Sequence, residues 1–181
     1  GQPALLSHSA HLLMDARNGL LLNIAVDEAN GTAERSQALD MLDGLRRQRG
    51  RCVPQTLGAD AGYQAGPFLH ELERRGVTPC VPVAGGPIRG LDHPDPKRRA
   101  AAQARYDARR RMKTAAYRAM QQIRKRVEEI IGWCKTIGGL ERARFVGRWK
   151  IKLQATLTGA AYNLLRLARL RPATPSQPAA A

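Results

Sequence analysis

One glutamate in the second half of the chain stands among basic residues at helical spacing. Residues 121–135 read QQIRKRVEEIIGWCK, the composition of an amphipathic helix. At about 100° per residue, five residues project within roughly 80° of one another: Gln121, Arg124, Glu128, Ile131 and Lys135. A separate apolar seam contains Ile123, Val127, Ile130, Cys134 and Ile137. A single carboxylate between cations is typical of one end of an active site.

The adjacent glutamate, Glu129, projects about 100° away from Glu128 and lies nearer Lys125. Lys125 and Glu129 form an i,i+4 pair in the less favourable order, with the lysine first. We therefore expect Glu129 to be a solvent-facing partner of Lys125, and only Glu128 is a candidate for chemistry.

A second carboxylate is marked by its place at the end of an expected strand. The stretch QTLGADAGY predicts a strand over residues 56–59 that leads to Asp60, with Gly58 and Gly62 keeping the backbone open. Ligands of open α/β sheets gather beyond the carboxyl ends of strands. A lone aspartate at this place is more often a helix cap or turn residue, so Asp60 gains weight only together with Glu128.

Two carboxylates in a polar site are the oxygen ligands that Mg²⁺ prefers, and paired metals can clamp the oxygens of phosphoryl transfer. Arg124 and Lys135 would then hold the phosphates of a nucleic-acid backbone, with Lys125 and Arg126 in the surrounding basic field. The alternative for Arg124 and Lys135 is a salt-bridged helix face.

The overall charge favours a polyanionic partner. Lysine and arginine number 30 against 15 acidic residues, a formal net charge of +15, and nucleic acid is the default partner for such a balance. A solvated arginine-rich surface is the alternative. Trp133, Phe145 and Trp149 would either stack on bases or belong to the core, and the core is the better place for Trp133.

Other chemistries find no support in the residue pattern. The three cysteines have neither CxxC spacing nor a histidine at zinc-finger distance, which fits a reducing cytoplasm, near the nucleoid for a DNA-binding protein. No histidine pairing or serine elbow motif occurs. No run of about 18 apolar residues occurs, so we expect no membrane association.

The elements expected to position these residues alternate between strands and helices. A hairpin is expected from residue 11 to residue 29, with Asn18-Gly19 in its turn. The next expected elements are a helix over 34–50, a strand over 56–59, a helix over 66–75 and an edge strand over 77–83. A basic helix over 97–113 is expected to continue or kink into the helix over 121–135, and a last helix follows over 150–170. The leucines of the last helix and Tyr162 would cover a sheet face. The order predicts an α/β fold with a central sheet between helices.

These residues resemble the DDE transposases of bacterial insertion sequences, specifically the insertion-sequence-five-like group with its DxGY and YxxRxxxExxxxxxK signatures. Residues 60–63, DAGY, match the first signature. Arg124, Glu128 and Lys135 match the second, and Gln121 stands where the tyrosine is expected. The GWxKTxGG pattern behind them, GTAER and TLTGAAYNLLRL extend the resemblance over most of residues 5–170.

The resemblance implies an RNase H-like fold, DNA cleavage at transposon ends with Mg²⁺ or Mn²⁺, and transfer of the freed 3′-hydroxyl to target DNA. Asp60 and Glu128 would be the second and third catalytic, metal-binding carboxylates. Arg124 and Lys135 would contact DNA near the cleaved phosphate, with Tyr63 of the DxGY element as a further DNA contact. Pairing two transposon ends makes a homodimer on DNA possible.

The chain also departs from the family pattern. The first catalytic aspartate belongs on a strand before the hairpin, and no such strand precedes residue 5. Asp15, in the turn, and Asp27, at the end of a strand, are not assigned that role. We therefore expect an N-terminally truncated catalytic domain over residues 1–171, lacking its first strand and a complete metal site, followed by a disordered tail over residues 172–181. Residues 85–113 diverge most.

Two other interpretations stay open at this point. One is a non-catalytic basic protein that binds nucleic acid through its helices, with structural carboxylates. The other is a decayed reading frame that makes no functional protein.

Overall fold

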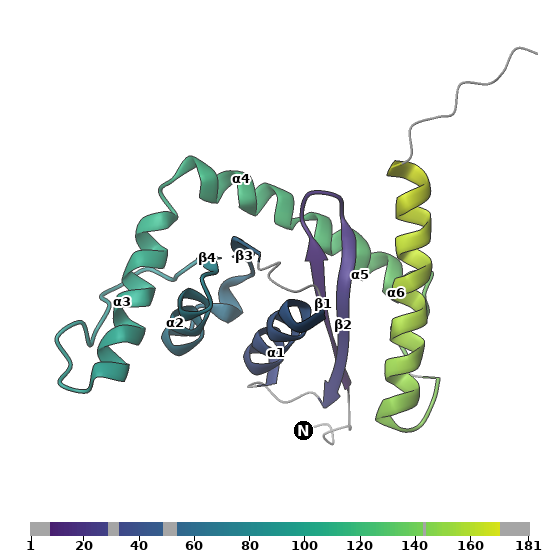
Figure 1. Ribbon diagram of the computed structural model, residues 1–181, viewed down its shortest axis with the longest axis horizontal. Coiled ribbons are helices and arrows are strands. Elements are labelled where there is room, and N and C mark those ends of the chain that lie inside the picture. The colour runs from purple at the N-terminus through teal and green to yellow at the C-terminus, as the bar shows by residue number, and fades with distance from the viewer. Residues whose placement is uncertain (1–7, 29–32, 49–53, 143, 171–181) are drawn as a thin grey trace, which may run out of the picture.

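A computed structural model describes residues 8–28, 33–48, 54–142 and 144–170 of the chain. Its elements, in chain order, are β1 (His8–Asp15), β2 (Leu20–Glu28), α1 (Ala33–Gln48), β3 (Thr56–Gly58), the 3-10 helix η1 (Ala61–Tyr63), α2 (Gly66–Arg74), β4 (Thr78–Cys80), α3 (Pro96–Arg111), α4 (Ala115–Arg124), α5 (Arg126–Thr136) and α6 (Arg148–Leu170). The molecule is elongated, with α3 at one end, α6 at the other, and α4 and α5 running between them (Figure 1). The expected tail after residue 171 lies outside the described residues.

The N-terminal hairpin forms as predicted. The side chain of Asp15 accepts hydrogen bonds from the backbone N–H groups of Arg17 and Asn18 at 3.0 and 3.2 Å, an Asx-type turn. Gly19 takes φ +70°, where a side chain would be strained, and its N–H donates to the Asp15 carbonyl at 2.8 Å. Local residue chemistry therefore fixes the turn, and the register of β1 on β2 shifts once, between Leu13 and Met14.

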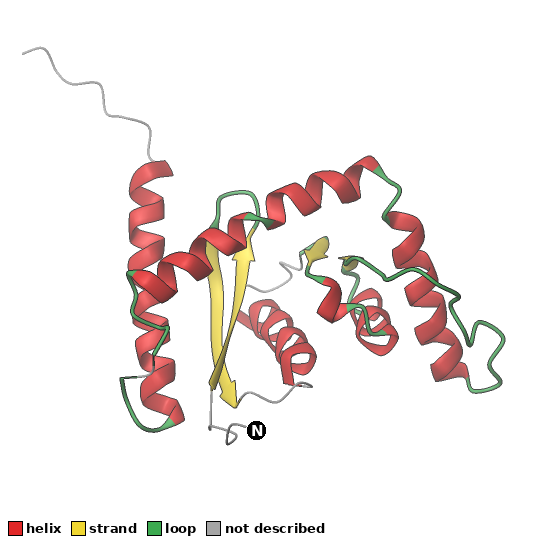
Figure 2. Ribbon diagram, turned by 180° about the vertical axis from the view of Figure 1, so that it is seen from behind, coloured by secondary structure: helices red, strands yellow, loops and turns green. Residues whose placement is uncertain are grey.

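The strands form two small sheets instead of the single central sheet that we expected. β1 pairs antiparallel with β2, and β3 pairs parallel with β4. β3 and β4 have three residues each, shorter than predicted. β3 lies on the side of β4 that faces β1, so the two sheets turn their unpaired edge strands, β1 and β3, toward each other (Figures 1 and 2). This part of the chain is thus mixed α/β without a continuous sheet.

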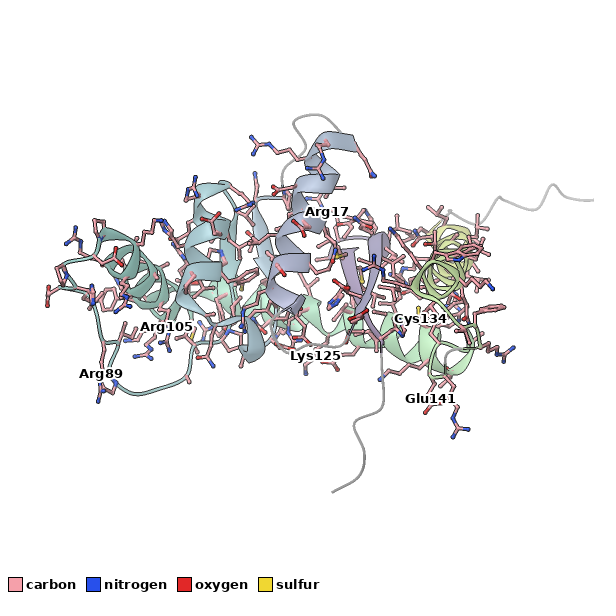
Figure 3. The ribbon with its side chains drawn as sticks, turned by 90° about the horizontal axis from the view of Figure 1, so that it is seen from below. Arg17, Arg89, Arg105, Lys125, Cys134 and Glu141 are labelled. Atoms are coloured by element: carbon pink, nitrogen blue, oxygen red, sulfur yellow. The ribbon has the colours of Figure 1, made fainter. Side chains whose placement is uncertain are left out.

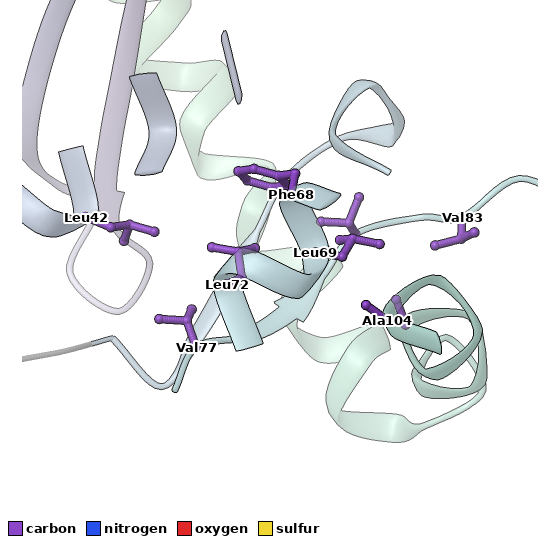
Figure 4. Close-up of a cluster of buried hydrophobic side chains, with 9 residues drawn as sticks. Leu42, Phe68, Leu69, Leu72, Val77, Val83 and Ala104 are labelled. Carbon is purple, nitrogen blue, oxygen red and sulfur yellow. The ribbon is translucent and has the colours of Figure 1, made fainter. Parts of the chain in front are cut away.

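One hydrophobic core forms around α2 (Figure 4). The buried face of α2 presents Phe68, Leu69 and Leu72 at helical spacing, against Leu42 of α1 and Ala104 of α3. Leu69 and Leu72 are 0% exposed. This core joins α1, α2 and α3 to the sheet β3–β4.

A second core lies between the hairpin, α5 and α6. It contains Ile24 of β2, Ile130 and Cys134 of α5, and Tyr162 of α6, whose ring meets Trp133 edge-on at a centroid distance of 5.5 Å. Trp133 is therefore a core residue, as we predicted. The two cores lie in different parts of the molecule, which are joined by α4 and α5 and also by α1, a helix that contacts both the hairpin and α2.

Asn163 of α6 holds the outer edge of β2. Its side chain accepts a hydrogen bond from the N–H of Leu21 and donates one to the carbonyl of Leu21, both at 2.8 Å. The methyl group of Leu21 also packs against Gly159, where the missing side chain allows close approach. A helix thus protects β2, while β1 keeps an unpaired edge among the described residues.

The long helical region is broken twice. Thr114 caps α4 through its hydroxyl, which accepts from the Tyr117 N–H at 3.2 Å, so the basic helix kinks there. A second break at Lys125 separates α4 from α5, where we predicted a continuous helix over residues 121–135. The Glu128 N–H donates to the Lys125 carbonyl at 3.0 Å, three residues back, which marks a tightened turn.

Two burial predictions are wrong. Ile137, the last member of the expected seam, is 71% exposed because α5 ends at Thr136. The final helix covers β2 with Ile151, Ala155, Gly159 and Tyr162, whereas most of its leucines face solvent. Among the described residues, no helix has the length and apolar character that a membrane span requires.

Candidate functional site

Asp60 lies two residues beyond β3, at the carboxyl end of the strand as predicted. Its Oδ1 accepts a hydrogen bond from the Gly62 N–H at 2.9 Å and caps η1. The residue is exposed, and its Oδ2 accepts no hydrogen bond from the described residues. The capping role is therefore present, and one carboxylate oxygen stays free for a ligand.

The loop that carries Asp60 is held from both sides. Arg35 of α1 donates from Nη1 to the Gly62 carbonyl at 3.3 Å. The ring of Tyr63 packs on Phe68 at a centroid distance of 5.4 Å, and burial raises the pKa of Tyr63. Tyr63, a predicted DNA contact, is thus partly buried with its ring against the first core, where it positions the loop.

α4 is anchored to the same small sheet by Gln121. Its Nε2 donates to the Cys80 carbonyl of β4 at 2.8 Å, and its Oε1 accepts from Arg124 Nε at 3.1 Å. Gln121, Arg124 and Glu128 therefore share one side of the helical region, as their spacing predicted. The glutamine at the expected tyrosine position links the sheet to Arg124.

The strand leading to Asp60 packs directly on the helix that carries Arg124. A Cβ added to Gly58 would lie 3.9 Å from Arg124 Cβ and 3.4 Å from Met120 Cγ. Arg124 thus lies beside Gly58, the last residue of β3. Gly58 precedes Asp60 by two residues. Residues far apart in the sequence are brought to one place.

Glu128 follows in the first turn of α5. Its side chain is 65% exposed, and Oε1 lies 3.9 Å from Nη2 of Arg124, whose side chain is 26% exposed. An exposed pair at this distance contributes little stability, and the N-terminus of a helix favours a negative charge. The Glu128 carboxylate is therefore accessible and only loosely held.

The other predicted DNA contacts differ in their surroundings. Lys125 and Lys135 are exposed, and Lys135 follows Glu128 by about two turns on nearly the same side. Figure 3 shows Lys125 near the middle of the molecule, between Arg105 and Cys134. Arg126 instead donates to the carbonyls of Ala16 and Arg17 in the hairpin turn, at 3.0 and 2.7 Å. The expected ion pair between Lys125 and Glu129 does not form among the described residues.

The described residues of this chain do not assemble a complete metal-binding cluster. All 15 acidic residues lie in the described ranges. Within those ranges, no group of three aspartate, glutamate, histidine or cysteine side chains is placed to hold a metal ion. Asp15 is engaged in the hairpin turn. Asp27 accepts from the Glu28 N–H at 2.9 Å and lies 3.4 Å from Arg148. Asp60 and Glu128 remain exposed oxygen ligands of the kind that suits Mg²⁺ or Mn²⁺.

Two positioning residues were not among the predicted site residues. Arg35 holds the Asp60 loop, and its only sequence signal is the GTAER stretch. Gln121 was predicted to lie on the same side of its helix as Arg124 and Glu128, but its hydrogen bond to β4 depends on a strand more than 40 positions away. No local pattern indicates such a contact.

The geometry therefore combines a strand-end carboxylate, an arginine beside that strand, an accessible glutamate and flanking lysines. The family model for the transposase DDE domain matches residues 7–164. Neither the curated proteins nor the solved structures contain a match. With most of its length matched, this chain belongs to the transposase DDE domain family.

Proposed function

We propose that this chain is the larger part of a catalytic domain, over residues 1–171, from a transposase of the insertion-sequence-five-like group. Its reaction is cleavage of DNA at transposon ends and joining of the freed 3′-hydroxyl to target DNA. One observation carries the proposal: Arg124 lies against the end of β3 and beside Glu128, which unites the two signature segments in space.

Asp60 and Glu128 are the proposed metal-binding, catalytic residues. Both carboxylates are exposed, and each retains oxygen atoms that no strong partner occupies. A bound Mg²⁺ or Mn²⁺ would supply Lewis-acid activation of the scissile phosphate. Arg124 and Lys135, with Lys125, would neutralise the phosphates of the DNA strand and keep it in register. Arg126 would support this surface by fixing the hairpin turn.

The proposed site needs a third carboxylate from outside this chain. Every acidic residue of residues 1–181 is described, and none joins Asp60 and Glu128 in a cluster of three. The facing edges of β1 and β3 offer backbone groups for an added strand (Figure 1). A strand paired with both would turn the two small sheets into one mixed, RNase H-like sheet and carry the missing ligand to Asp60.

A strand-transfer assay with a labelled transposon-end duplex tests the catalytic proposal. We expect this chain alone to give very low Mg²⁺-dependent turnover, because one of three ligands is absent. Addition of a polypeptide that supplies an acidic strand should raise turnover by at least tenfold. Asp60→Ala and Glu128→Gln should abolish that gain.

Glu129→Gln is the matched control, since it removes an adjacent exposed carboxylate that projects about 100° away from Glu128. Its turnover should equal that of the unmodified chain. If this chain alone gave high turnover and Asp60→Ala abolished it, the proposal that one metal ligand is missing from the chain would be wrong. Turnover insensitive to both Asp60→Ala and Glu128→Gln would contradict the assigned roles.

A non-catalytic DNA-binding function is the second candidate, favoured by the net charge of +15. Under this alternative, Glu128→Gln leaves every activity intact while Arg124→Ala weakens DNA binding. Loss of strand transfer in Glu128→Gln with unchanged DNA binding would exclude it.

A further inference from the structure

α6 has a second apolar face that nothing in the described molecule covers. We name it the outer stripe and define it by Trp149, Leu153, Leu157, Ala160, Leu164 and Leu167. Its large members are strongly exposed: Trp149 67%, Leu153 50%, Leu157 62%, Leu164 69% and Leu167 44%. α6 forms one end of the molecule, and no other element lies beyond it (Figures 1 and 2).

The outer stripe is a narrow and continuous feature of the helix. At 100° per residue its members fall within about 80° of one another. The residues that pack on β2, such as Ala155 and Tyr162, project to the opposite side of the same helix. The stripe positions are separated by 4, 4, 3, 4 and 3 residues, close to the spacing of a coiled-coil seam.

We propose that the outer stripe is a homodimer interface, in which α6 of one copy packs antiparallel against α6 of a second copy. A two-fold interface requires a surface that complements itself. With the axis between residues 158 and 159, Leu153 meets Leu164 of the second copy and Leu157 meets Ala160. Large residues thus face small ones near the centre, whereas a parallel pair would set Ala160 against Ala160 and leave a gap.

The size of the stripe suits this partner. The exposed fractions of its members correspond to about 600 Å² per copy, so a dimer would bury at most roughly 1,200 Å², the lower limit for a specific interface. The largest contiguous apolar patch on a monomer is typically about 300–600 Å² and is often functional, and the outer stripe is at the upper end of that range. A second α6 helix also matches the stripe in length along its whole course.

Charge makes this association distinctive. α6 contains five basic residues and no acidic one: Arg148, Lys150, Lys152, Arg166 and Arg169. Antiparallel packing brings the basic ends of the two copies together, so repulsion opposes an apolar attraction. Salt screens such repulsion, and the dimer should therefore strengthen as salt rises. Binding to DNA phosphates weakens under the same change. The interface needs no catalytic site and goes beyond the proposed function.

The test measures the mass of the full chain in solution. Light scattering after size exclusion at about 20 and 200 µM protein, and at roughly 0.1 and 0.5 M salt, should show twice the 19.8 kDa of the chain, with more dimer at high salt. Leu164→Asp should reduce the dimer fraction at least tenfold. Leu165→Asp is the matched control, because Leu165 is 49% exposed but lies outside the stripe; its dimer fraction should not change.

Cysteine crosslinking tests the orientation. With Cys52 replaced by serine, an oxidised mixture of Leu153→Cys and Leu164→Cys chains should form mixed disulfides, and neither variant alone should form its own. Crosslinking of each variant with itself would overturn the antiparallel arrangement. A monomer at every concentration and salt, or an equal loss of dimer in Leu164→Asp and Leu165→Asp, would overturn the interface itself.

Discussion

At the scale of single residues, Arg75 joins two helices of the first core. It follows the end of α2, and its Nε and Nη2 each lie 3.0 Å from the carboxylate of Asp43 on α1. Its Nη1 lies 2.6 Å from Glu71. These hydrogen bonds from the guanidinium hold the pKa of Asp43 and of Glu71 below their ordinary values of 3.8 and 4.5. Both carboxylates therefore stabilise the fold more when they are ionised.

This arrangement predicts an acid-dependent loss of stability. A carboxyl whose pKa is lower in the folded state stabilises the protein fully above its unfolded pKa, and loses that contribution as pH falls through the folded pKa. The free energy of unfolding in urea should thus be constant near neutrality and decrease below about pH 4.5. Arg75→Gln should cost about 1 kcal/mol at pH 7 and flatten the acidic slope.

Arg118→Gln provides the comparison, since Arg118 is exposed on α4 and forms no ion pair within the described ranges. Its acid slope should match that of the unmodified chain. An unchanged slope in Arg75→Gln would show that other groups govern the acid transition.

Spacing alone was sufficient to place Gln121, Arg124 and Glu128 on one side, because that geometry is local to a helix. It was not sufficient for Arg126, whose guanidinium binds hairpin carbonyls more than 100 positions away. Tyr63 was predicted as a DNA contact from the DxGY signature, and its ring packs against the first core. Contacts between distant segments decide which member of a basic or aromatic cluster faces solvent.

At the scale of elements, α2 approaches α3 closely where α2 begins. Gly66 is buried, and a Cβ added there would lie 2.5 Å from the carbonyl oxygen of Ala101. A backbone atom within a helix cannot move without shifting its neighbours. The absent side chain therefore sets the separation of α2 from α3.

Gly66→Ala should destabilise the protein by about 2 kcal/mol, because one helix must move to accommodate the methyl group. Gly132→Ala on α5 is the matched substitution: no atom lies within 4 Å of the added Cβ. It should stabilise the protein by roughly 0.5–1 kcal/mol through helix propensity. Urea unfolding of both variants measures the difference, and equal effects would contradict the close approach.

The sequence predicted the types of most elements because their signals are local. The hairpin has its Asn-Gly turn, and α2 has one apolar face and a glycine beyond its end. Periodicity could not predict how α6 is oriented, because that helix has two apolar faces and only packing decides which meets β2. The division into two sheets was likewise unpredicted, since strand partners are chosen by tertiary contacts.

At the scale of the whole molecule, positive charge extends from α3 at one end to α6 at the other. DNA binding should therefore depend steeply on salt. Lys135→Ala should weaken binding to duplex DNA and reduce the slope of log K against log salt by about 1. Fluorescence anisotropy across a salt series measures this slope.

Arg46→Ala on α1 is the comparison for that series, because Arg46 is exposed and lies on a different helix from Arg124, Glu128 and Lys135. We expect its slope to change less. Identical changes in Lys135→Ala and Arg46→Ala would mean that DNA binds without a preferred face.

The break at Lys125 has a consequence for how the two cores are joined. α4 is fastened to the sheet β3–β4 through Gln121, whereas α5 is buried in the other core through Ile130 and Cys134. Arg124 is thus attached to the sheet β3–β4, whereas Glu128 is attached to the second core. The distance between their charged groups therefore depends on how the two cores are placed, and α1, which packs on the hairpin as well as on α2, helps to keep that placement.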